Sequence, residues 1–455
     1  MSAINQYTEL YELAREALDS KTPALLNSLR SEARKALAGA SLPTKRTEGY
    51  AKTSIEDMFA PDYGVNLNRI QFPVDIARAF KCEVPNLSTL LGLVLNDVFV
   101  PTATLQNNLP EGATVCSLAY AAGKYPEIVR KYLGKIAPMN NPAVALNTLL
   151  LQDGVFIHIP ANMAVEHPIQ IVNIFSATVP LLAMRRVLIV LDEGASCSVL
   201  LCDHTQEKNN SYLSSEVIEV VAGRNSRLDF VSLEESSAKT SRHSMLYARQ
   251  EDGSDLNVNS TTIHNGSTRN EFNVDIVGEY ANTELSGMVI AGGERHVDNY
   301  SNVSHNAPHS KSNQLFKYLV DDRATCAFEG GITVSSNAPF TEGYQSNRNI
   351  LASEDARMYS KPQLLIYNDE VKCSHGAATG QLDENQLFYM QTRGIPVETA
   401  RRLLMQAFMT DAVARIRMDA VRTRLGQLIE KCLGGEYASC SGDCLPSNCI
   451  VSGSK

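Results

Sequence analysis

Hydrophobic and polar residues change their spacing twice along the chain, and these changes divide it into three regions. Near the N-terminus apolar residues recur every three or four positions, the spacing of a helix that buries one face. The members of this stripe are Ile4, Tyr7, Leu10, Tyr11, Ala14 and Leu18. Thr22 and Pro23 then provide an N-cap and a first residue for a second helix, which ends near Gly39. We expect residues 1–150 to form a mainly helical region that contains some strands.

From about residue 154 to residue 370 the pattern is that of β-strands: apolar residues alternate with polar ones or form short runs, and no helical spacing occurs. A turn pattern made of a small residue, a spacer and an apolar residue returns about every 30 residues. It occurs at residues 195–197, 226–228, 254–256, 283–285, 324–326 and 356–358. The longest interval, between residues 285 and 324, is expected to hold an inserted loop around 296–309.

Stacked coils, each of which buries its apolar face against its neighbours, produce a repeat of this kind. A β-sandwich or a barrel has the same strand composition, so periodicity alone leaves the choice of fold open. The repeat favours a solenoid, and we expect this β core to occupy residues 151–385.

After Pro396 the helical spacing returns. The apolar stripe of this segment contains Val397, Ala400, Leu404, Ala407, Phe408, Val413, Ile416, Val421, Leu425, Leu428 and Ile429. The arginines beside it are Arg401, Arg402, Arg415, Arg417, Arg422 and Arg424. They indicate either a solvated helix face or a face that docks in the groove of a partner. We expect a helical domain over residues 386–435 and a disordered Cys-rich tail over 436–455.

The composition is that of an ordinary globular protein, with 455 residues, 44% hydrophobic and 20% charged. This length predicts two or three structural units. A formal net charge of −9 argues against nucleic acid or an anionic membrane as a partner. No apolar run approaches the roughly 20 residues that a membrane helix needs, and residues 1–10 lack the pattern of a secretory signal. We therefore expect a cytoplasmic protein.

The ten cysteines are expected to be reduced thiols, mostly buried as small apolar residues. Cys440, Cys444 and Cys449 would hold zinc or an iron–sulfur cluster only with a fourth ligand from elsewhere, so a redox-sensitive tail is the favoured interpretation. The histidines His296, His305 and His309 lie in a segment rich in Asn and Ser. They indicate a metal site, a solvated loop or a contact with another chain.

Cys373 and His375 are the most informative pair of residues in the chain. Being one residue apart, they point to the same side of a strand. The small residues at 376–378 leave space for another protein or a metal ion beside them. Imidazole and thiolate are natural ligands of iron and of iron–sulfur clusters. A packed thiol beside a surface imidazole is the alternative, and the two residues alone do not decide between these interpretations.

The segment 361–395 around this pair resembles the C-terminal signature of the SufB/SufD family of SUF iron–sulfur assembly scaffolds. Gly376 stands where the SufB type places a Glu, so the resemblance is to the SufD type. Further motifs of the family follow in its order at residues 43–53, 296–299, 305, 312–315, 328–330 and 345–349. The chain departs from the family at Tyr50, where a Trp is usual, and in its Cys-rich tail.

This resemblance implies a mainly β protein: a right-handed parallel β-helix flanked by N-terminal and C-terminal helical regions. It implies a non-catalytic scaffold subunit whose β-helix pairs with a SufB-like paralogue, with His375 facing that partner and Cys373 beside it. His375 is the candidate metal ligand for a transient iron–sulfur cluster at this interface, and no cofactor is expected to be bound firmly. A SufC-like ABC-type ATPase would dock on the C-terminal helices, at Leu404, Phe408, Arg401 and Arg402. A homodimer is expected when the chain is alone.

The alternative from the residues is a β-helix enzyme, a polysaccharide lyase or hydrolase. Such chemistry needs clustered carboxylates and often aromatic platforms for sugars. Asp298, Glu329 and Glu342 are too scattered in the sequence to nominate, and the absence of Trp weakens this hypothesis further. The sequence contains no Walker A, Gly-x-Ser-x-Gly or Rossmann motif.

Overall fold

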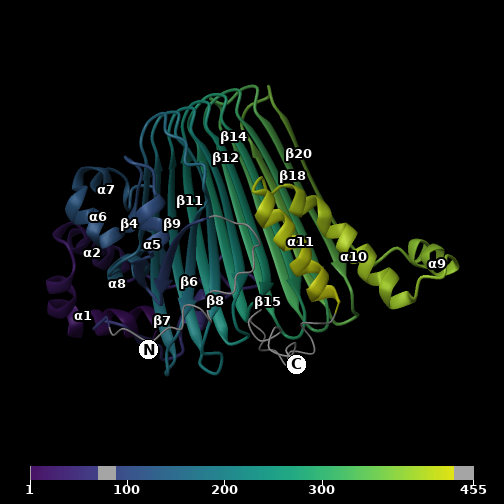
Figure 1. The fold of residues 1–455 in the computed structure, drawn as a ribbon, viewed down its shortest axis with the longest axis horizontal. Helices are drawn as coiled ribbons and strands as arrows, with labels where there is room; N and C mark the ends of the chain where they lie inside the picture. Colours follow the sequence, from purple (N-terminus) through teal and green to yellow (C-terminus); the bar gives the residue numbers. More distant parts are fainter. Residues whose placement is uncertain (1, 70–88, 435–455) are drawn as a thin grey trace.

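Figure 1 shows a long stack of parallel strands with helices packed against it, in a computed structural model that describes residues 2–69 and 89–434. The helices are α1 (Ala3–Lys21), α2 (Ala24–Leu37), α3 (Ile55–Phe59), α5 (Ala103–Asn108), α6 (Leu118–Lys124), α7 (Pro126–Tyr132), α8 (Pro142–Leu150), α9 (Glu384–Thr392), α10 (Val397–Ala414) and α11 (Asp419–Leu433). The predicted Cys-rich tail at 436–455 lies outside the described residues.

The strands fall into a short N-terminal group and a long regular series. The first group is β1 (Gly64–Val65), β2 (Leu90–Leu95), β3 (Val98–Pro101) and β4 (Thr114–Ser117). The series is β5 (Val155–Ile159), β6 (Ile169–Phe175), β7 (Leu181–Leu191), β8 (Ser196–Thr205), β9 (Tyr212–Ala222), β10 (Arg227–Glu235), β11 (Thr240–Gln250), β12 (Asp255–His264), β13 (Ser267–Ile276), β14 (Asn282–Ala291), β15 (His296–His305), β16 (Lys311–Val320), β17 (Thr325–Val334), β18 (Glu342–Leu351), β19 (Arg357–Ile366) and β20 (Lys372–Gly380).

Strands of this series alternate between two sheets. The odd-numbered strands from β5 to β19 form one sheet, here the odd sheet, and the even-numbered strands from β6 to β20 form the other, the even sheet. All pairings within the series are parallel, and each strand pairs with those one turn before and one turn after it. Each turn of the chain therefore adds one strand to each sheet. This arrangement is a parallel β-solenoid with flanking helices, and it confirms the predicted fold class.

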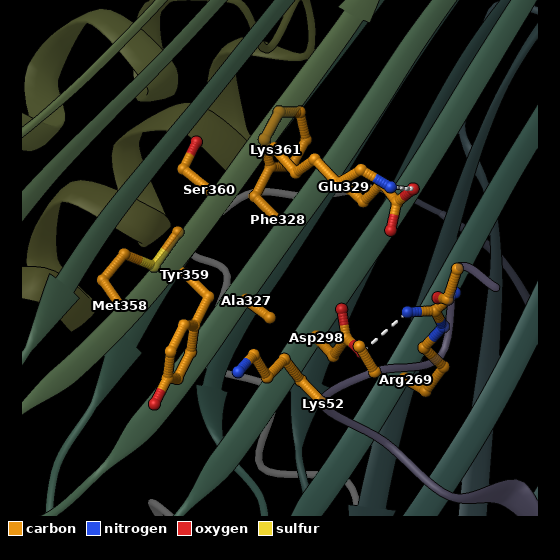
Figure 2. Close-up of a pocket in the computed structure, with 12 residues that line it drawn as sticks. Lys52, Arg269, Asp298, Ala327, Phe328, Glu329, Met358, Tyr359, Ser360 and Lys361 are labelled. Atoms are coloured by element: carbon orange, nitrogen blue, oxygen red, sulfur yellow. Dashed lines mark hydrogen bonds and ion pairs between the residues drawn. The ribbon is translucent and has the colours of Figure 1, made fainter. Parts of the chain in front are cut away.

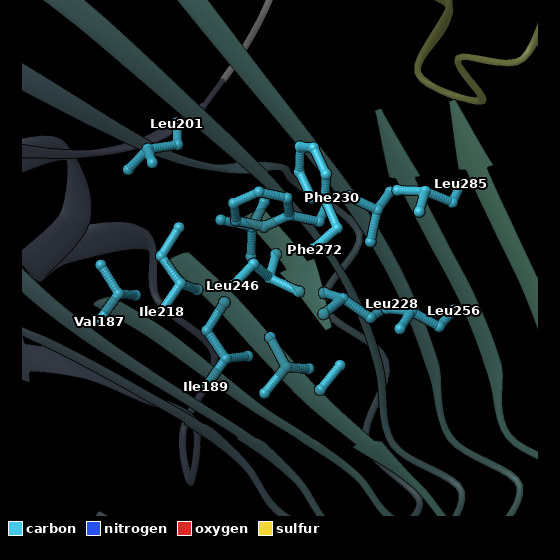
Figure 3. Packing of buried hydrophobic residues seen from close by; sticks show 14 of the residues in the cluster. Val187, Ile189, Leu201, Ile218, Leu228, Phe230, Leu246, Leu256, Phe272 and Leu285 are labelled. Carbon is cyan, nitrogen blue, oxygen red and sulfur yellow. The ribbon is translucent and has the colours of Figure 1, made fainter. Parts of the chain in front are cut away.

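Alternation along the strands places an apolar core between the two sheets. Figure 3 shows part of it, in which Phe230 of the even sheet approaches Leu246 and Phe272 of the odd sheet. These side chains are at most 5% exposed. Each turn contributes side chains to the same column, so the core continues along the solenoid and no turn has a core of its own.

Beside this apolar column the solenoid interior contains charges that neutralise one another. Arg185 of β7 lies 2.8 Å from Asp203 of β8. Arg242 of β11 lies 3.0 Å from Glu216 of β9 and 3.2 Å from the same Asp203. Buried charges of this kind are tolerated only when they are paired. The network therefore requires these four strands to stack in this register.

Helices cover the outer faces of both sheets. Helix α8 packs on the odd sheet over an apolar patch that includes Leu182, Met184 and Leu213, and α1 and α2 pack against α8. Helices α10 and α11 pack on the even sheet over Met288 and Ile290. The pattern agrees with the apolar stripes predicted at both ends of the chain. None of the helices in the described parts is long and apolar enough to cross a membrane.

Four of the six C-terminal arginines bind the solenoid or are buried against it. Arg401 donates to the carbonyl oxygen of Ala352, which follows β18. Arg415 lies 2.6 Å from Glu284, and Arg417 lies 2.6 Å from Asp255. Arg424 is buried. The arginine stripe thus faces the molecule itself over much of its length, where the sequence indicated solvent or a partner.

The predicted inserted loop around residues 296–309 is wrong. Residues 296–305 form strand β15, in which His296 lies opposite Ser267 and Thr325 without any break in register. Up to residue 283 the recurring turn pattern lies at the start of even strands. From residue 324 it lies at the start of odd strands. The long interval between these two sites is therefore a change of sheet and contains no insertion.

Candidate functional site

One end of the solenoid is closed and the other is open. At the first end the short strands β3 and β4 run antiparallel to their neighbours, and α5 and α6 pack beside them. At the other end β19 and β20 are the last strands of their sheets, and no further strand of the described chain pairs with them. A free strand edge offers unpaired N–H and C=O groups to another chain.

The side chains of this last turn are exposed as well. Large apolar residues on and after β19 are open to solvent, with Tyr367 65% exposed and Leu365 49% exposed. Tyr359 and Ile366 are also exposed. Apolar groups gathered beside an open strand edge are typical of a protein–protein contact. We define the open end as strands β19 and β20 with the turn between them.

Cys373 and His375 lie at this open end, on β20. The thiol of Cys373 is half-buried beside Ile332 and Val334, and burial raises its pKa above the ordinary range. Its register partner Gly343 has no side chain, which leaves room for the sulfur atom. His375 is exposed. The two residues lie on the same side of β20, as predicted. The thiol is packed against the solenoid, whereas the imidazole is accessible.

The solenoid interior is polar in the turns that precede His375. Gln345 is the register partner of His375, and its side-chain N–H donates to Oε1 of Gln314 over 3.2 Å. Ser301 donates to the same oxygen over 2.7 Å. The side-chain amide oxygen of Gln345, Oε1, is buried and accepts no hydrogen bond within the described chain. A buried acceptor without a donor is costly, so this oxygen is available to a ring N–H of His375.

The three histidines of the predicted group do not converge. Nε2 of His296 lies 2.8 Å from the hydroxyl of Thr53. The ring nitrogens of His305 lie 2.7 and 2.8 Å from the hydroxyls of Ser310 and Ser312. His309 stacks between two aromatic rings. Across residues 2–69 and 89–434 no group of three or more His, Cys, Asp or Glu side chains is placed to hold a metal ion.

Two motifs that are remote in the sequence meet on the outer face of the odd sheet. Thr53 donates a 2.6 Å hydrogen bond to Asp298. Arg269 donates to the carbonyl of Gly49 over 2.8 Å and lies 4.6 Å from the ring centre of Tyr50. Residues 43–53 are therefore a strap that is tied to β13 and β15. Tyr50 stands at the position of the usual Trp, and its ring packs on Arg269.

A pocket of about 370 Å³ lies between this strap and the last odd strands, as Figure 2 shows. Its carboxylates are both engaged, Asp298 with Arg269 at 2.7 Å and Glu329 with Lys361 at 3.0 Å. Lys52 lies 3.4 Å from the ring centre of Tyr359. Sequence reasoning missed this pocket because its two walls are more than 200 residues apart. Glu342 pairs with Lys311 at 3.5 Å on the other sheet. The three acids that were too scattered in the sequence to nominate for an enzyme are thus each paired with a cation.

The C-terminal residues selected from the sequence lie partly against the solenoid. Lys317 donates to the backbone oxygen of Phe408 and lies 4.7 Å from its ring centre. Arg401 donates to the carbonyl of Ala352 over 3.1 Å. Leu404 and Arg402 are half-buried.

More accessible apolar residues lie on α9, which projects beyond the last strands in Figure 1 and buries none of its residues. Phe388 is 67% exposed and Tyr389 58% exposed. Two adjacent aromatic residues in an otherwise polar helix are the signal in the sequence that marks this surface.

This β-solenoid is closed at one end, and at the other it presents unpaired strand edges and an exposed helix, features through which proteins commonly contact other chains. Comparison with known families identifies the family. Residues 174–408 match the SufBD core domain of the SUF system for FeS cluster assembly, and residues 1–171 match the SufBD protein N-terminal region. The chain belongs to the SufBD family of iron–sulfur cluster assembly proteins.

Several relatives extend this result. A SufBD family iron–sulfur cluster assembly protein of Synechocystis is 28% identical over 433 residues, which cover 92% of this chain and 94% of that protein. The iron–sulfur cluster assembly protein SufD of Bacillus subtilis is 25% identical over 70% of this chain and 74% of its own length. SufD of Escherichia coli is 33% identical over 36% of this chain and 38% of its own. These matches support the SufD type within the family.

The strap yields a first testable prediction. Asp298→Asn removes one of the two carboxylates paired with the buried Arg269, the other being Glu271, and should lower the free energy of unfolding by about 2 kcal/mol. Glu329→Gln is the matched control, because Lys361 is exposed and such pairs contribute about 1 kcal/mol or less. Urea denaturation of both variants measures the difference. Equal losses would contradict the assigned role of Arg269 and Asp298.

His305 yields a prediction on pH. Burial lowers the pKa of His305 to about 4, whereas an unfolded His titrates near 6.5. Folding thus favours the neutral form of His305. Its contribution to the free energy of unfolding is therefore complete above pH 6.5 and is lost as the pH falls towards 4. That loss is on the order of 3 kcal/mol. The unfolding free energy of the wild type should fall more steeply between pH 7 and 4.5 than that of His305→Gln; parallel curves would refute the assignment.

Proposed function

We propose that this chain is a SufD-type, non-catalytic scaffold subunit of a SufB–SufC–SufD complex in which iron–sulfur clusters are assembled in the cytoplasm. The observation that carries the proposal is the open end of the solenoid in a chain of the SufBD family. An enzyme with its own active site needs no unpaired strand edge, whereas a subunit that extends its sheets into a partner does.

The open end is the proposed contact with the SufB-like paralogue. Strands β19 and β20 would continue their sheets into the partner, and the exposed Tyr367 and Leu365 would be covered there. The same edges would join two copies of this chain when the paralogue is absent. Co-expression with the SufB-like and SufC-like subunits, followed by size-exclusion chromatography, tests this proposal. Failure of the three chains to elute together would refute it.

His375 is the proposed ligand of iron or of a nascent cluster at this contact. Iron is the cargo of the complex, and this chain supplies one accessible imidazole while the partner supplies the remaining ligands. Gln345 supports the role, because its buried carbonyl oxygen would accept one ring N–H and leave the other nitrogen free to bind metal. Cys373 would serve mainly as packing, since its thiol is half-buried and its pKa is raised.

The SufC-like ATPase is proposed to dock on α9 and the first half of α10. Phe388 and Tyr389 are its main contacts, joined by the exposed Leu403 and by Arg402 and Leu404 beside it. Aromatic residues with free faces are the usual centres of such contacts. Phe408 and Arg401 would act indirectly, because their contacts hold α10 on the solenoid.

His375→Ala should leave the complex intact and reduce cluster assembly at least tenfold. One polar side chain is a small share of a large interface, but a lost ligand is not replaced by the backbone. Recovery of the complex and the activity of an iron–sulfur enzyme in dependent cells measure the two effects. Cys373→Ser is the comparison and should retain most activity. Normal cluster delivery by His375→Ala would remove this residue from the site.

Phe388→Asp combined with Tyr389→Asp should abolish binding of the ATPase, because a charge in a docking face loses its hydration without a partner. Pairing with the SufB-like subunit should persist, since the open end is unchanged. Leu13→Asp is the control, as Leu13 is an exposed apolar residue on α1. Pull-down with each partner separates the two contacts. Retained ATPase binding by the double variant would show that α9 is not the docking site.

A further inference from the structure

One corner of the solenoid repeats an unusual backbone conformation over seven turns. In the turn before each even strand from β6 to β18, one residue has a positive φ angle. These residues are Asn162, Gly194, Asn225, Gly253, Tyr280, His309 and Phe340, with φ between 55° and 68°. We define them as the corner ladder. They occupy equivalent places in successive turns, and the backbone N–H groups of all but Tyr280 donate to a carbonyl in the corresponding turn of the next coil, as in Gly194 to Arg224, Gly253 to Glu279 and Phe340 to Glu370.

The residue types on the corner ladder change in the direction of the open end. The first four turns alternate Asn and Gly, the two residues that adopt a left-handed conformation at least cost. The last three turns carry Tyr280, His309 and Phe340, bulky residues for which this conformation is unfavourable. The backbone gains nothing from these rings, so the reason for them lies in their side chains.

The three rings form a stack at the surface. Tyr280 and His309 have ring centres 4.8 Å apart and planes inclined by 5°, and His309 and Phe340 are 4.8 Å apart and inclined by 15°. Tyr280 is 64% exposed and Phe340 is 54% exposed. The stack therefore contributes little to the core. Beyond Tyr280 the next position of the corner ladder is Gly253, which has no side chain of its own; the side-chain amide of Asn225 reaches over Gly253, and the Tyr280 ring remains largely exposed.

Carboxylates flank Gly253 and Tyr280 in the sequence. Glu251, Asp252 and Glu279 are all exposed in the two turns that carry Gly253 and Tyr280. Asp252 accepts the backbone N–H of Glu279 and lies 3.7 Å from Arg224, the only cation paired with this group in the described chain. The excess of negative charge adds to the negative face of the ring. Such a site favours a flat cation that can both stack and donate to carboxylates, which is the guanidinium group.

We propose that the corner ladder is a docking site for an arginine side chain presented by a partner protein. The guanidinium stacks on the outer face of Tyr280, above Gly253, and donates hydrogen bonds to Glu279 and Asp252. His309 and Phe340 support the Tyr280 ring from behind and fix its plane. This site uses neither the open end nor α9, so it goes beyond the proposed scaffold contacts and identifies a third contact surface.

The absence of Trp from the chain permits a direct measurement. Tyr280→Trp introduces a single Trp at the docking face, and its fluorescence is followed during titration with an acetylated tetra-arginine peptide. We expect a saturable change, and binding of tetra-lysine at least fivefold weaker because an ammonium group does not stack as a plane. Adding Glu279→Gln and Asp252→Asn to the reporter should weaken arginine binding at least fivefold. Equal binding of both peptides, unaffected by these two changes, would overturn the proposal.

A second set of variants separates binding from folding. Tyr280→Asn introduces the residue that the same corner uses in earlier turns, so the left-handed backbone is retained at lower cost. We expect a melting temperature equal to or above that of the wild type, together with loss of tetra-arginine binding in calorimetry. Phe340→Asn should retain folding and weaken binding less, because its ring is two positions away from the docking face. A lower melting temperature of Tyr280→Asn with unchanged binding would show that the rings only brace the turns.

Discussion

The parallel pairing of each strand with those one turn before and one turn after it is the constraint on which this structure depends. Such pairing satisfies every interior strand but leaves each end of the solenoid with a free edge. The chain closes one end with antiparallel strands and helices, and no strand among the described residues covers the other end. The function proposed for this family member rests on that asymmetry, because the open end carries the accessible His375 and the exposed apolar residues of the last turn.

The interior changes along the same axis. Most turns contribute apolar side chains to a continuous column, with paired charges such as Arg242 and Glu216 beside it. Near the open end the column gives way to amides, among them Gln314 and Gln345. Paired charges specify the register of the early turns, since a displaced strand would leave a charge without its partner. The amides leave an acceptor below His375, which suits an imidazole whose orientation matters.

Segments from both ends of the chain fasten the solenoid from outside. The strap at residues 43–53 is tied to the odd sheet through Thr53 and Asp298, and the C-terminal helices are tied to the even sheet through Arg417 and Asp255. Both attachments combine apolar packing with ion pairs or hydrogen bonds to strands far away in the sequence. Helix α9 has no such attachment, and its aromatic residues remain available for a partner.

The sequence by itself determined the elements and their general arrangement. Apolar spacing predicted the helices at both ends and the long series of strands, and the pair Cys373 and His375 was placed correctly on one strand because alternation is a local property. The order of the motifs indicated the family.

Only the tertiary structure decided which turns of the solenoid stack on one another. A repeat of about 30 residues does not reveal the sheet to which a strand belongs, so the strand at His296–His305 was mistaken for a loop. The sequence did not predict the strap, the inward-facing arginines or the stack from Tyr280 to Phe340. In each case the contacts join residues whose proximity depends on the register between turns, and no local sequence pattern specifies that register.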